Sequence, residues 1–110
     1  MRAPAATLDR TLAALADPQR RRTVNLLREA PRRAGELAQA IGLRAPTMSR
    51  HLRVLRECGL VEESHPGFDA RVRIYRLRPA PIAELRAWLE LTEQLWSDEL
   101  AAFKAHLERP

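Results

Sequence analysis

One short stretch of the 110-residue sequence, from Pro46 to Glu57, concentrates side chains that could recognise a ligand. If this stretch is helical, polar groups share one side of it: Thr47, Ser49, Arg50 and Arg53, with Arg56 near the far end. Apolar residues occupy the other side: Met48, Leu52 and Leu55. A hydroxyl group can bind several bases or a phosphate oxygen, and a guanidinium can bind guanine O6 and N7 together or clamp a phosphate. The stretch therefore has the chemistry of a helix that enters the major groove of DNA, and the alternative is a solvated amphipathic helix without a ligand.

Groupings that support catalysis or metal binding are missing from the sequence. It has no paired carboxylates in a turn, no nucleophile spaced for a neighbouring base and no phosphate-binding loop. Its single cysteine, Cys58, excludes an intrachain disulfide and a metal cage of several cysteines. We therefore expect no enzymatic activity, no cofactor and no metal site.

Charge is distributed unevenly along the chain. The net charge is +5, and 18 of the 19 basic residues are arginine. Residues 1–78 hold 16 arginines against eight acidic residues, whereas residues 79–110 hold three basic residues against six acidic ones. A GC-rich genome would explain the preference for arginine but not this asymmetry. A basic body followed by an acidic end favours a polyanion-binding surface on the first part only.

The spacing of apolar residues predicts one domain over residues 7–110, after a flexible tail over residues 1–6. Four helices are expected in the first half, over residues 7–16, 17–29, 33–40 and 45–58. Asp17 can cap the second of these, and Pro18 suits its first position because no N–H is needed there. Gly42 is expected to end the third helix.

The period of the pattern changes after Gly59. Residues 60–64 and 71–77 are expected to form the strands of a β-hairpin, and a final helix is expected over about residues 80–107. The order predicts a mainly α fold with a small β-hairpin, a winged helix-turn-helix. Its helix-turn-helix would span residues 33–58 and its wing residues 60–77.

The final helix carries more apolar surface than one small domain can cover. Trp88 and Trp96 are eight residues apart, with leucines and Phe103 interleaved. Such a stripe usually marks a partner interface, although packing of both tryptophans in the core, or a pocket for a small apolar effector between them, is an alternative. We expect a symmetric homodimer in which the first and last helices meet their copies. The residues expected in this interface are Leu8, Leu12, Leu15, Leu85, Trp88, Leu89, Leu95, Trp96 and Phe103.

Five short motifs resemble the ArsR-type family of winged-helix repressors, and the resemblance covers residues 8–107. They are ALADPQRRR at 14–22, GELA at 35–38, SRHLRVL at 49–55, GLV at 59–61 and YRL at 75–77. The resemblance implies a homodimeric repressor that binds double-stranded DNA at a palindromic operator and leaves it on a signal that the sequence does not identify. Thr47, Ser49, Arg50 and Arg53 would then contact bases, and phosphates would be neutralised by Arg33, Arg44, Arg71 and Arg73.

The sequence departs from the family in two places. Many members sense metal through cysteines in the short third helix or through residue pairs on the last helix. Here the third helix lacks cysteine, and Asp98, His106 and Glu108 on the last helix do not have the required spacing. The tip of the wing, from His65 to Arg71, is longer than usual, and its Phe68 could reach the minor groove or pack back on the wing.

Two further residues have alternative interpretations. His51 could contact DNA or could hold the helix-turn-helix together from a half-buried position. Cys58 could be a redox switch, although no second cysteine is available for a disulfide, or a small semi-buried residue.

A protein of a different class could have the same features. A winged helix that docks a protein partner through its hairpin or last helix would have an incidental basic charge. The N-terminal residues lack the apolar segment of a secretory signal, and no apolar run is long enough for a membrane span, so a cytoplasmic protein without a membrane partner is expected.

Overall fold

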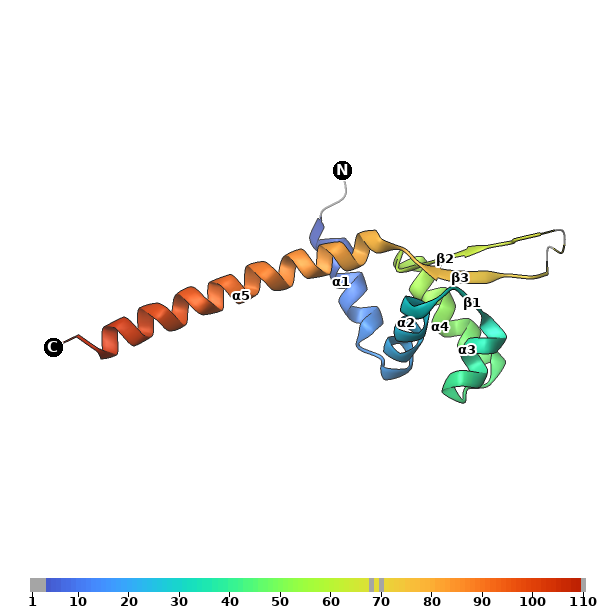
Figure 1. The fold of residues 1–110 in the computed structure, drawn as a ribbon, viewed down its shortest axis with the longest axis horizontal. Helices are drawn as coiled ribbons and strands as arrows, with labels where there is room; N and C mark the ends of the chain where they lie inside the picture. Colours follow the sequence, from blue (N-terminus) through green and yellow to red (C-terminus); the bar gives the residue numbers. More distant parts are fainter. Residues whose placement is uncertain (1–3, 68, 70, 110) are drawn as a thin grey trace.

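The computed structural model describes residues 4–67, 69 and 71–109, with only the backbone for residues 4–6. A compact body carries a sheet that projects as a wing at one side, and a long helix extends from the other side (Figure 1). The molecule measures 73 × 36 × 20 Å. In chain order the elements are α1 (Pro4–Leu15), α2 (Pro18–Glu29), β1 (Arg32–Arg33), α3 (Ala34–Ile41), α4 (Ala45–Glu57), β2 (Val61–Ser64), β3 (Ile74–Leu77) and α5 (Pro79–Leu107).

Helix α1 begins at Pro4, three residues before the predicted start. Residues 4–6, which were expected to belong to a flexible tail, form the first turn of α1, and residues 1–3 lie outside the described part. The start of α2 is confirmed, because Oδ1 of Asp17 accepts hydrogen bonds from the backbone N–H groups of Gln19 at 2.7 Å and Arg20 at 3.1 Å. Pro18 occupies the first helical position, as predicted.

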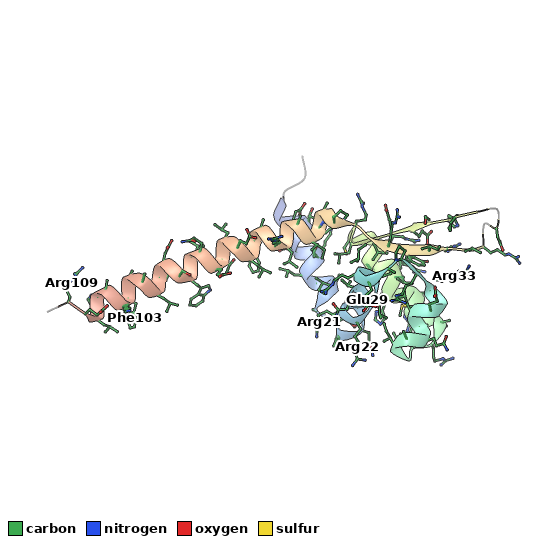
Figure 2. The ribbon with its side chains drawn as sticks, in the orientation of Figure 1. Arg21, Arg22, Glu29, Arg33, Phe103 and Arg109 are labelled. Carbon is green, nitrogen blue, oxygen red and sulfur yellow. The ribbon has the colours of Figure 1, made fainter. Side chains whose placement is uncertain are left out.

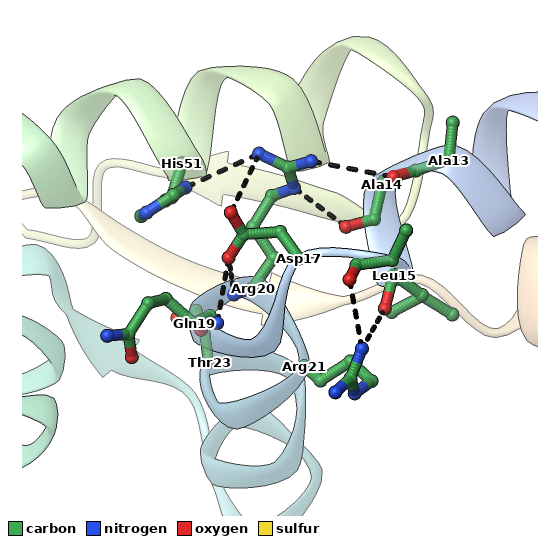
Figure 3. Close-up of polar contacts among 10 residues, drawn as sticks. Ala13, Ala14, Leu15, Asp17, Gln19, Arg20, Arg21, Thr23 and His51 are labelled. Atoms are coloured by element: carbon green, nitrogen blue, oxygen red, sulfur yellow. Dashed lines mark hydrogen bonds and ion pairs between the residues drawn. The ribbon is translucent and has the colours of Figure 1, made fainter.

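Two arginines of α2 donate hydrogen bonds to backbone carbonyl groups at the C-terminal end of α1. Arg20 donates from Nε to the carbonyl oxygen of Ala14 at 2.7 Å, and Arg21 donates from Nη1 to the carbonyl oxygens of Leu15 at 2.9 Å and Ala16 at 3.1 Å (Figure 3). These carbonyls lie at the end of the helix, where backbone acceptors lack intrahelical donors. The two arginines therefore fix the angle between α1 and α2.

A tight turn separates α3 from α4. Gly42 adopts φ +82°, in the left-handed region that L side chains disfavour, and its N–H donates to the carbonyl oxygen of Ala38 at 2.8 Å. The expected glycine cap of α3 is confirmed. At the other end of α3, the backbone N–H of Arg33 donates to Oε1 of Glu36 at 2.9 Å.

The sheet has three strands in the order β1–β3–β2, all antiparallel. The predicted hairpin is confirmed, with Val61 opposite Leu77 and Ser64 opposite Ile74, but β3 begins at Ile74 rather than at residue 71. Strand β1 was not predicted, because two residues are too short to show a period. It pairs Arg32 with Tyr75 and Arg33 with Ile74, which ties the start of α3 to the wing.

The core lies between the helices of the body and the sheet. Leu37, Met48 and Leu55 are each 0% exposed, and Leu60 and Val61 at the start of the wing complete this centre. Leu52 of α4 is also buried. The apolar side predicted for α4 is therefore the side that faces the core.

Helix α5 leaves the body after packing against α1 and continues alone (Figure 1). Its apolar side chains remain exposed, with Trp96 at 64% and Phe103 at 61%. The alternative in which Trp88 and Trp96 pack in the core of the chain is wrong, since Trp88 is also exposed. No helix in the described ranges is both long enough and apolar enough to cross a membrane.

Candidate nucleic-acid interface

Helix α4 presents a polar face to solvent because three apolar residues anchor its opposite side. Ser49, Arg50 and Arg53 are exposed and Thr47 is half-buried, while Met48, Leu52 and Leu55 pack inward. Nη2 of Arg50 lies 3.5 Å from Oγ1 of Thr47, one helical turn earlier. This arrangement sets hydroxyl and guanidinium groups side by side near the N-terminal end of the helix, where a helix in the major groove reaches bases.

The fold brings separate parts of the sequence together around one open hollow of about 560 Å³, here called the wing hollow. Its lining residues come from the start of α3, from α4 and from the wing: Arg33, Ala34, Gly35, Ser49, Asp69, Arg71, Val72, Arg73 and Tyr75. Pairing of β1 with β3 causes this convergence, because Arg33 lies opposite Ile74. Three of the arginines predicted to contact phosphate therefore share a surface with Ser49 of α4.

Most of the predicted arginines form no close ion pair within the described part of the chain. Among the described residues, only Arg71 of this set has a carboxylate oxygen within 4.0 Å of its guanidinium, at 3.1 Å from Oδ1 of Asp69. Hydrogen bonds from the side chain and backbone of Arg71 hold the pKa of Asp69 below its usual value. In the ranges that the structure describes, the others have no carboxylate oxygen that close: Arg33, Arg44, Arg50, Arg53 and Arg73. The charge of Arg33 still helps to lower the pKa of Asp69, and that of Arg73 helps to lower the pKa of Glu63.

Arg56, at the far end of α4, has a different role. Its Nη1 lies 2.8 Å from Oε2 of Glu63 on β2, which joins the end of α4 to the wing. Burial alone would raise the pKa of Glu63, but a hydrogen bond from the Tyr75 hydroxyl and the nearby charges of Arg56 and Arg73 bring it below its usual value. Burial, followed by the contact with Glu63, raises the pKa of Tyr75. Sequence reasoning missed Glu63, and the pairing of Glu63 with Tyr75 in the hairpin is the signal that could have found it.

His51 is half-buried and its ring faces α2. Nδ1 of His51 lies 3.5 Å from Nη1 of Arg20, the same arginine that closes α1 (Figure 3). This contact supports the interpretation of His51 as a residue that holds the helix-turn-helix against α2. A contact between His51 and DNA stays a prediction.

The remaining candidates are placed as follows. Cys58 is half-buried at the end of α4, where its thiol donates to the carbonyl oxygen of Leu55 at 3.3 Å, and its redox activity stays a prediction. Phe68 lies outside the described residues. Within the described ranges, no three side chains of His, Cys, Asp or Glu gather as metal ligands.

The residues predicted to form a dimer interface are divided between α1 and α5. Leu8, Leu15 and Leu85 are half-buried, while Leu12 and the rest of the predicted set on α5 are exposed. Leu107, which the apolar pattern of the last helix includes, is exposed as well, and the structure adds two exposed leucines that the pattern did not include: Leu91 and Leu100.

Comparison with known proteins gives consistent results. Residues 17–63, from the cap of α2 into β2, match the family described as bacterial regulatory protein, arsR family. The chain is 36% identical over 95 residues to the HTH-type transcriptional regulator Rv2034 of Mycobacterium tuberculosis. The aligned residues make up 86% of this chain and 83% of that protein. The chain belongs to the arsR family of bacterial regulatory proteins.

Two solved structures extend the likeness beyond the matched segment. An ArsR-like transcriptional regulator from Rhodococcus sp. RHA1 has a TM-score of 0.78 and 30% identity, covering 96% of this ArsR-family chain and 97% of its own. A homodimeric winged helix-turn-helix DNA-binding domain from Mycobacterium bovis has a TM-score of 0.64 and 25% identity. The match covers 86% of this chain and 85% of the Mycobacterium bovis chain. The observed winged helix-turn-helix fold is that of these ArsR-family structures, with α3 and α4 as the two helices and β2 and β3 as the wing.

Proposed function

We propose that this ArsR-family protein is a sequence-specific DNA-binding repressor that acts as a homodimer on a palindromic operator. The observation that supports this proposal most strongly is the wing hollow, where Arg33, Arg71 and Arg73 converge beside Ser49 of α4. Arg50 and Arg53 extend the same basic surface along α4 without an internal carboxylate partner. A surface with several guanidinium groups and few acids suits the phosphate backbone on both sides of a major groove.

Within this proposal, the residues divide into two roles. Thr47, Ser49, Arg50 and Arg53 contact base edges, because they lie on the exposed side of the helix that enters the groove. The other arginines contact phosphates: Arg33, Arg44, Arg71 and Arg73. Phosphate contacts set the position of α4 on the duplex, whereas the contacts from α4 determine which sequence is bound.

The apolar stripe of α5 supports the homodimer. Leu95, Trp96, Leu100 and Phe103 are each about 60% exposed on a helix that leaves the body. Large apolar side chains in a row on a small domain usually mark a protein interface, and the similar Mycobacterium bovis domain is homodimeric. A twofold dimer built on α1 and α5 would place two α4 helices in successive major grooves, about 34 Å apart on a palindromic site. Occupation of a promoter by such a dimer would block transcription, and an effector would relieve the block.

DNA affinity tests the proposal directly. The labelled probe is a sequence selected from random DNA by the wild-type protein, and fluorescence anisotropy measures its Kd. We expect Arg50→Ala/Arg53→Ala to weaken binding by about 100-fold or more, since a good arginine–guanine pair contributes about 1–3 kcal/mol. Affinity of the wild type should also fall steeply with salt, because bound phosphates release counterions.

A matched control removes the same charge from a different place. Lys104→Ala/Arg109→Ala changes two basic residues at the far end of α5, where Figure 2 labels Arg109. This control should bind the selected DNA as the wild type does. If the two double variants weaken binding equally, or if the wild type selects no sequence and binds DNA only through its net charge, the winged helix is better described as a protein-interaction module.

A further inference from the structure

An open groove of about 710 Å³ lies where the end of α2, the end of β3 and the start of α5 meet, and it is here called the α5 groove. Tyr75 of β3 lines the wing hollow, whereas Arg76 and Leu77 of the same strand line this groove, so the two sites adjoin along β3 without sharing a lining residue. Figure 1 shows β3 leading from the wing to α5. The groove therefore has its own set of lining residues, next to those of the wing hollow.

The floor of the α5 groove is apolar. Leu27 is 4% exposed, and Leu77 and Ile82 pack against the core beside it. Two prolines extend this floor: Pro31 after α2 and Pro79 at the first position of α5. Neither proline offers a backbone N–H donor, so this part of the floor favours a hydrocarbon over a polar group.

The rim of the α5 groove is basic. Four arginines line it: Arg28, Arg76, Arg78 and Arg86. Arg86 is paired with Glu90 at 2.9 Å, and Arg76 lies 3.9 Å from Glu62. The lining carboxylate, Glu29, is 3.0 Å from Nη2 of Arg32.

Arg28 and Arg78 are the unpaired cations of this rim. Neither has a carboxylate oxygen within 4.0 Å among the described residues. Arg28 lies in the last turn of α2, and Arg78 immediately precedes α5, whose N-terminal end carries a partial positive charge. Two arginines without a close carboxylate line the same groove as the apolar side chains, and this combination matches an anion that also has an apolar body.

We propose that the α5 groove binds a medium-chain carboxylate, with the carboxylate on Arg28 and Arg78 and the hydrocarbon chain over Leu27, Leu77 and Ile82. A carboxylate accepts two parallel hydrogen bonds from a guanidinium, which a neutral head group cannot do. Transfer of the ligand's hydrocarbon chain from water into the groove supplies the rest of the binding affinity.

The position of the groove gives the ligand a regulatory role, and this part of the inference rests on the proposed function. The occupant touches β3, which carries the wing, and α5, which carries the exposed apolar stripe. Its binding is therefore coupled to the placement of the wing relative to the dimer helix. Such coupling is reciprocal, so the carboxylate and the DNA change the affinity of each other by the same factor.

Binding is tested first on the free protein by isothermal titration calorimetry, without DNA. The probes are decanoate, octanoate, hexanoate, acetate and decanol, with the longer carboxylates below their micellar concentrations and decanol below its solubility limit. We expect decanoate to bind, acetate not to bind, decanol to bind at least tenfold more weakly than decanoate, and the Kd to fall about fourfold for each methylene added between hexanoate and decanoate. Equal binding of decanol and decanoate, or no binding of decanoate, overturns the proposal without reference to DNA.

Variants then locate the site. Arg28→Gln/Arg78→Gln should weaken decanoate binding at least tenfold, whereas Lys104→Gln/Arg109→Gln, which removes the same charge far from the groove, should leave it unchanged. A circular-dichroism melt verifies that both variants fold. If both variants bind decanoate as the wild type does, the site is elsewhere and the proposal is wrong.

The regulatory part has its own measurement. Decanoate should change the Kd of wild-type protein for its selected DNA and leave the Kd of Arg28→Gln/Arg78→Gln unchanged. An unchanged Kd for the wild type, with decanoate bound, removes the regulatory role and leaves the binding site. Loss of the proposed DNA binding would leave the calorimetric result intact, so the two failures are distinguishable.

Discussion

Nη1 of Arg20 on α2 lies 3.5 Å from Nδ1 of His51 on α4, while Nε of the same guanidinium donates to the carbonyl oxygen of Ala14 on α1 at 2.7 Å. A single side chain thus joins three helices behind the exposed face of α4. The direction in which α4 presents Arg50 and Arg53 depends on this junction and on the buried leucines below it.

Replacement of Arg20 should destabilise the fold. Arg20→Ala leaves the carbonyl oxygen of Ala14 without its side-chain donor, and we expect the free energy of unfolding to fall by about 1–3 kcal/mol, measured by urea denaturation. Arg22→Ala, on the exposed side of the same helix, is the control and should change stability by less than about 0.5 kcal/mol. Equal effects of the two substitutions would show that the junction contributes nothing.

The cap of α2 should give stability a specific pH dependence. Hydrogen bonds from the backbone of Arg20 and then Gln19 outweigh a partial burial and hold the pKa of Asp17 below its usual value of 3.8. A carboxyl group with a depressed folded-state pKa stabilises the protein above the unfolded-state pKa, and this contribution is lost as the pH falls through the folded-state pKa. Asp17→Ala should therefore cost about 1 kcal/mol at pH 7 and progressively less below pH 4.

Chemical denaturation at a series of pH values measures this difference. Asp9→Ala, an exposed substitution on α1, is the control and should show no such convergence with the wild type. A gap between wild type and Asp17→Ala that stays constant from pH 7 into the acid range contradicts the assignment of the cap to the ionised carboxylate.

Two glycine substitutions in the helix-turn-helix should change the stability of the protein in opposite directions. Gly42 has φ +82° and open space around it, so Gly42→Ala should cost about 1–2 kcal/mol through backbone strain alone. Gly35 lies within α3, also in open space, and Gly35→Ala should stabilise the protein by about 0.4–1 kcal/mol. Thermal melts of the two variants check this pair, and a common sign would contradict the described turn.

Charge on the exposed stripe of α5 should disrupt the proposed dimer. Trp96→Glu/Leu100→Glu places two carboxylates in an interface that must be apolar, so this variant should sediment as a monomer at micromolar concentration, where the wild type sediments as a dimer. Ser97→Glu/Ala101→Glu adds the same charge one position round the helix and should remain dimeric. A monomeric wild type, or dimers for both variants, would contradict the interface.

The sequence was sufficient to predict those elements whose signals lie within a few neighbouring residues. The cap at Asp17, the end of α3 at Gly42 and the inward side of α4 were all predicted because caps and helical periods lie within a few neighbouring residues. The motifs also identified the family correctly, since they span most of the chain.

Features that depend on pairing between distant segments could not be predicted from the sequence, because no signal within a few neighbouring residues reports them. Strand β1 has only two residues, and nothing in Arg32 or Arg33 indicates that they lie opposite Tyr75 and Ile74. The convergence of the wing hollow follows from that register, and the contact of Arg56 with Glu63 follows from the packing of α4 against β2. The early start of α1 was missed because its first turn lacks an apolar period.

The central claim is that a dimer inserts two copies of α4 into successive major grooves. Methylation interference at guanine N7 on the selected DNA measures major-groove contact most directly, because N7 is exposed only there. We expect two symmetric clusters of interference centred about 10–11 base pairs apart, both lost with Arg50→Ala/Arg53→Ala. A single cluster, or binding that tolerates methylation at every guanine, would contradict it.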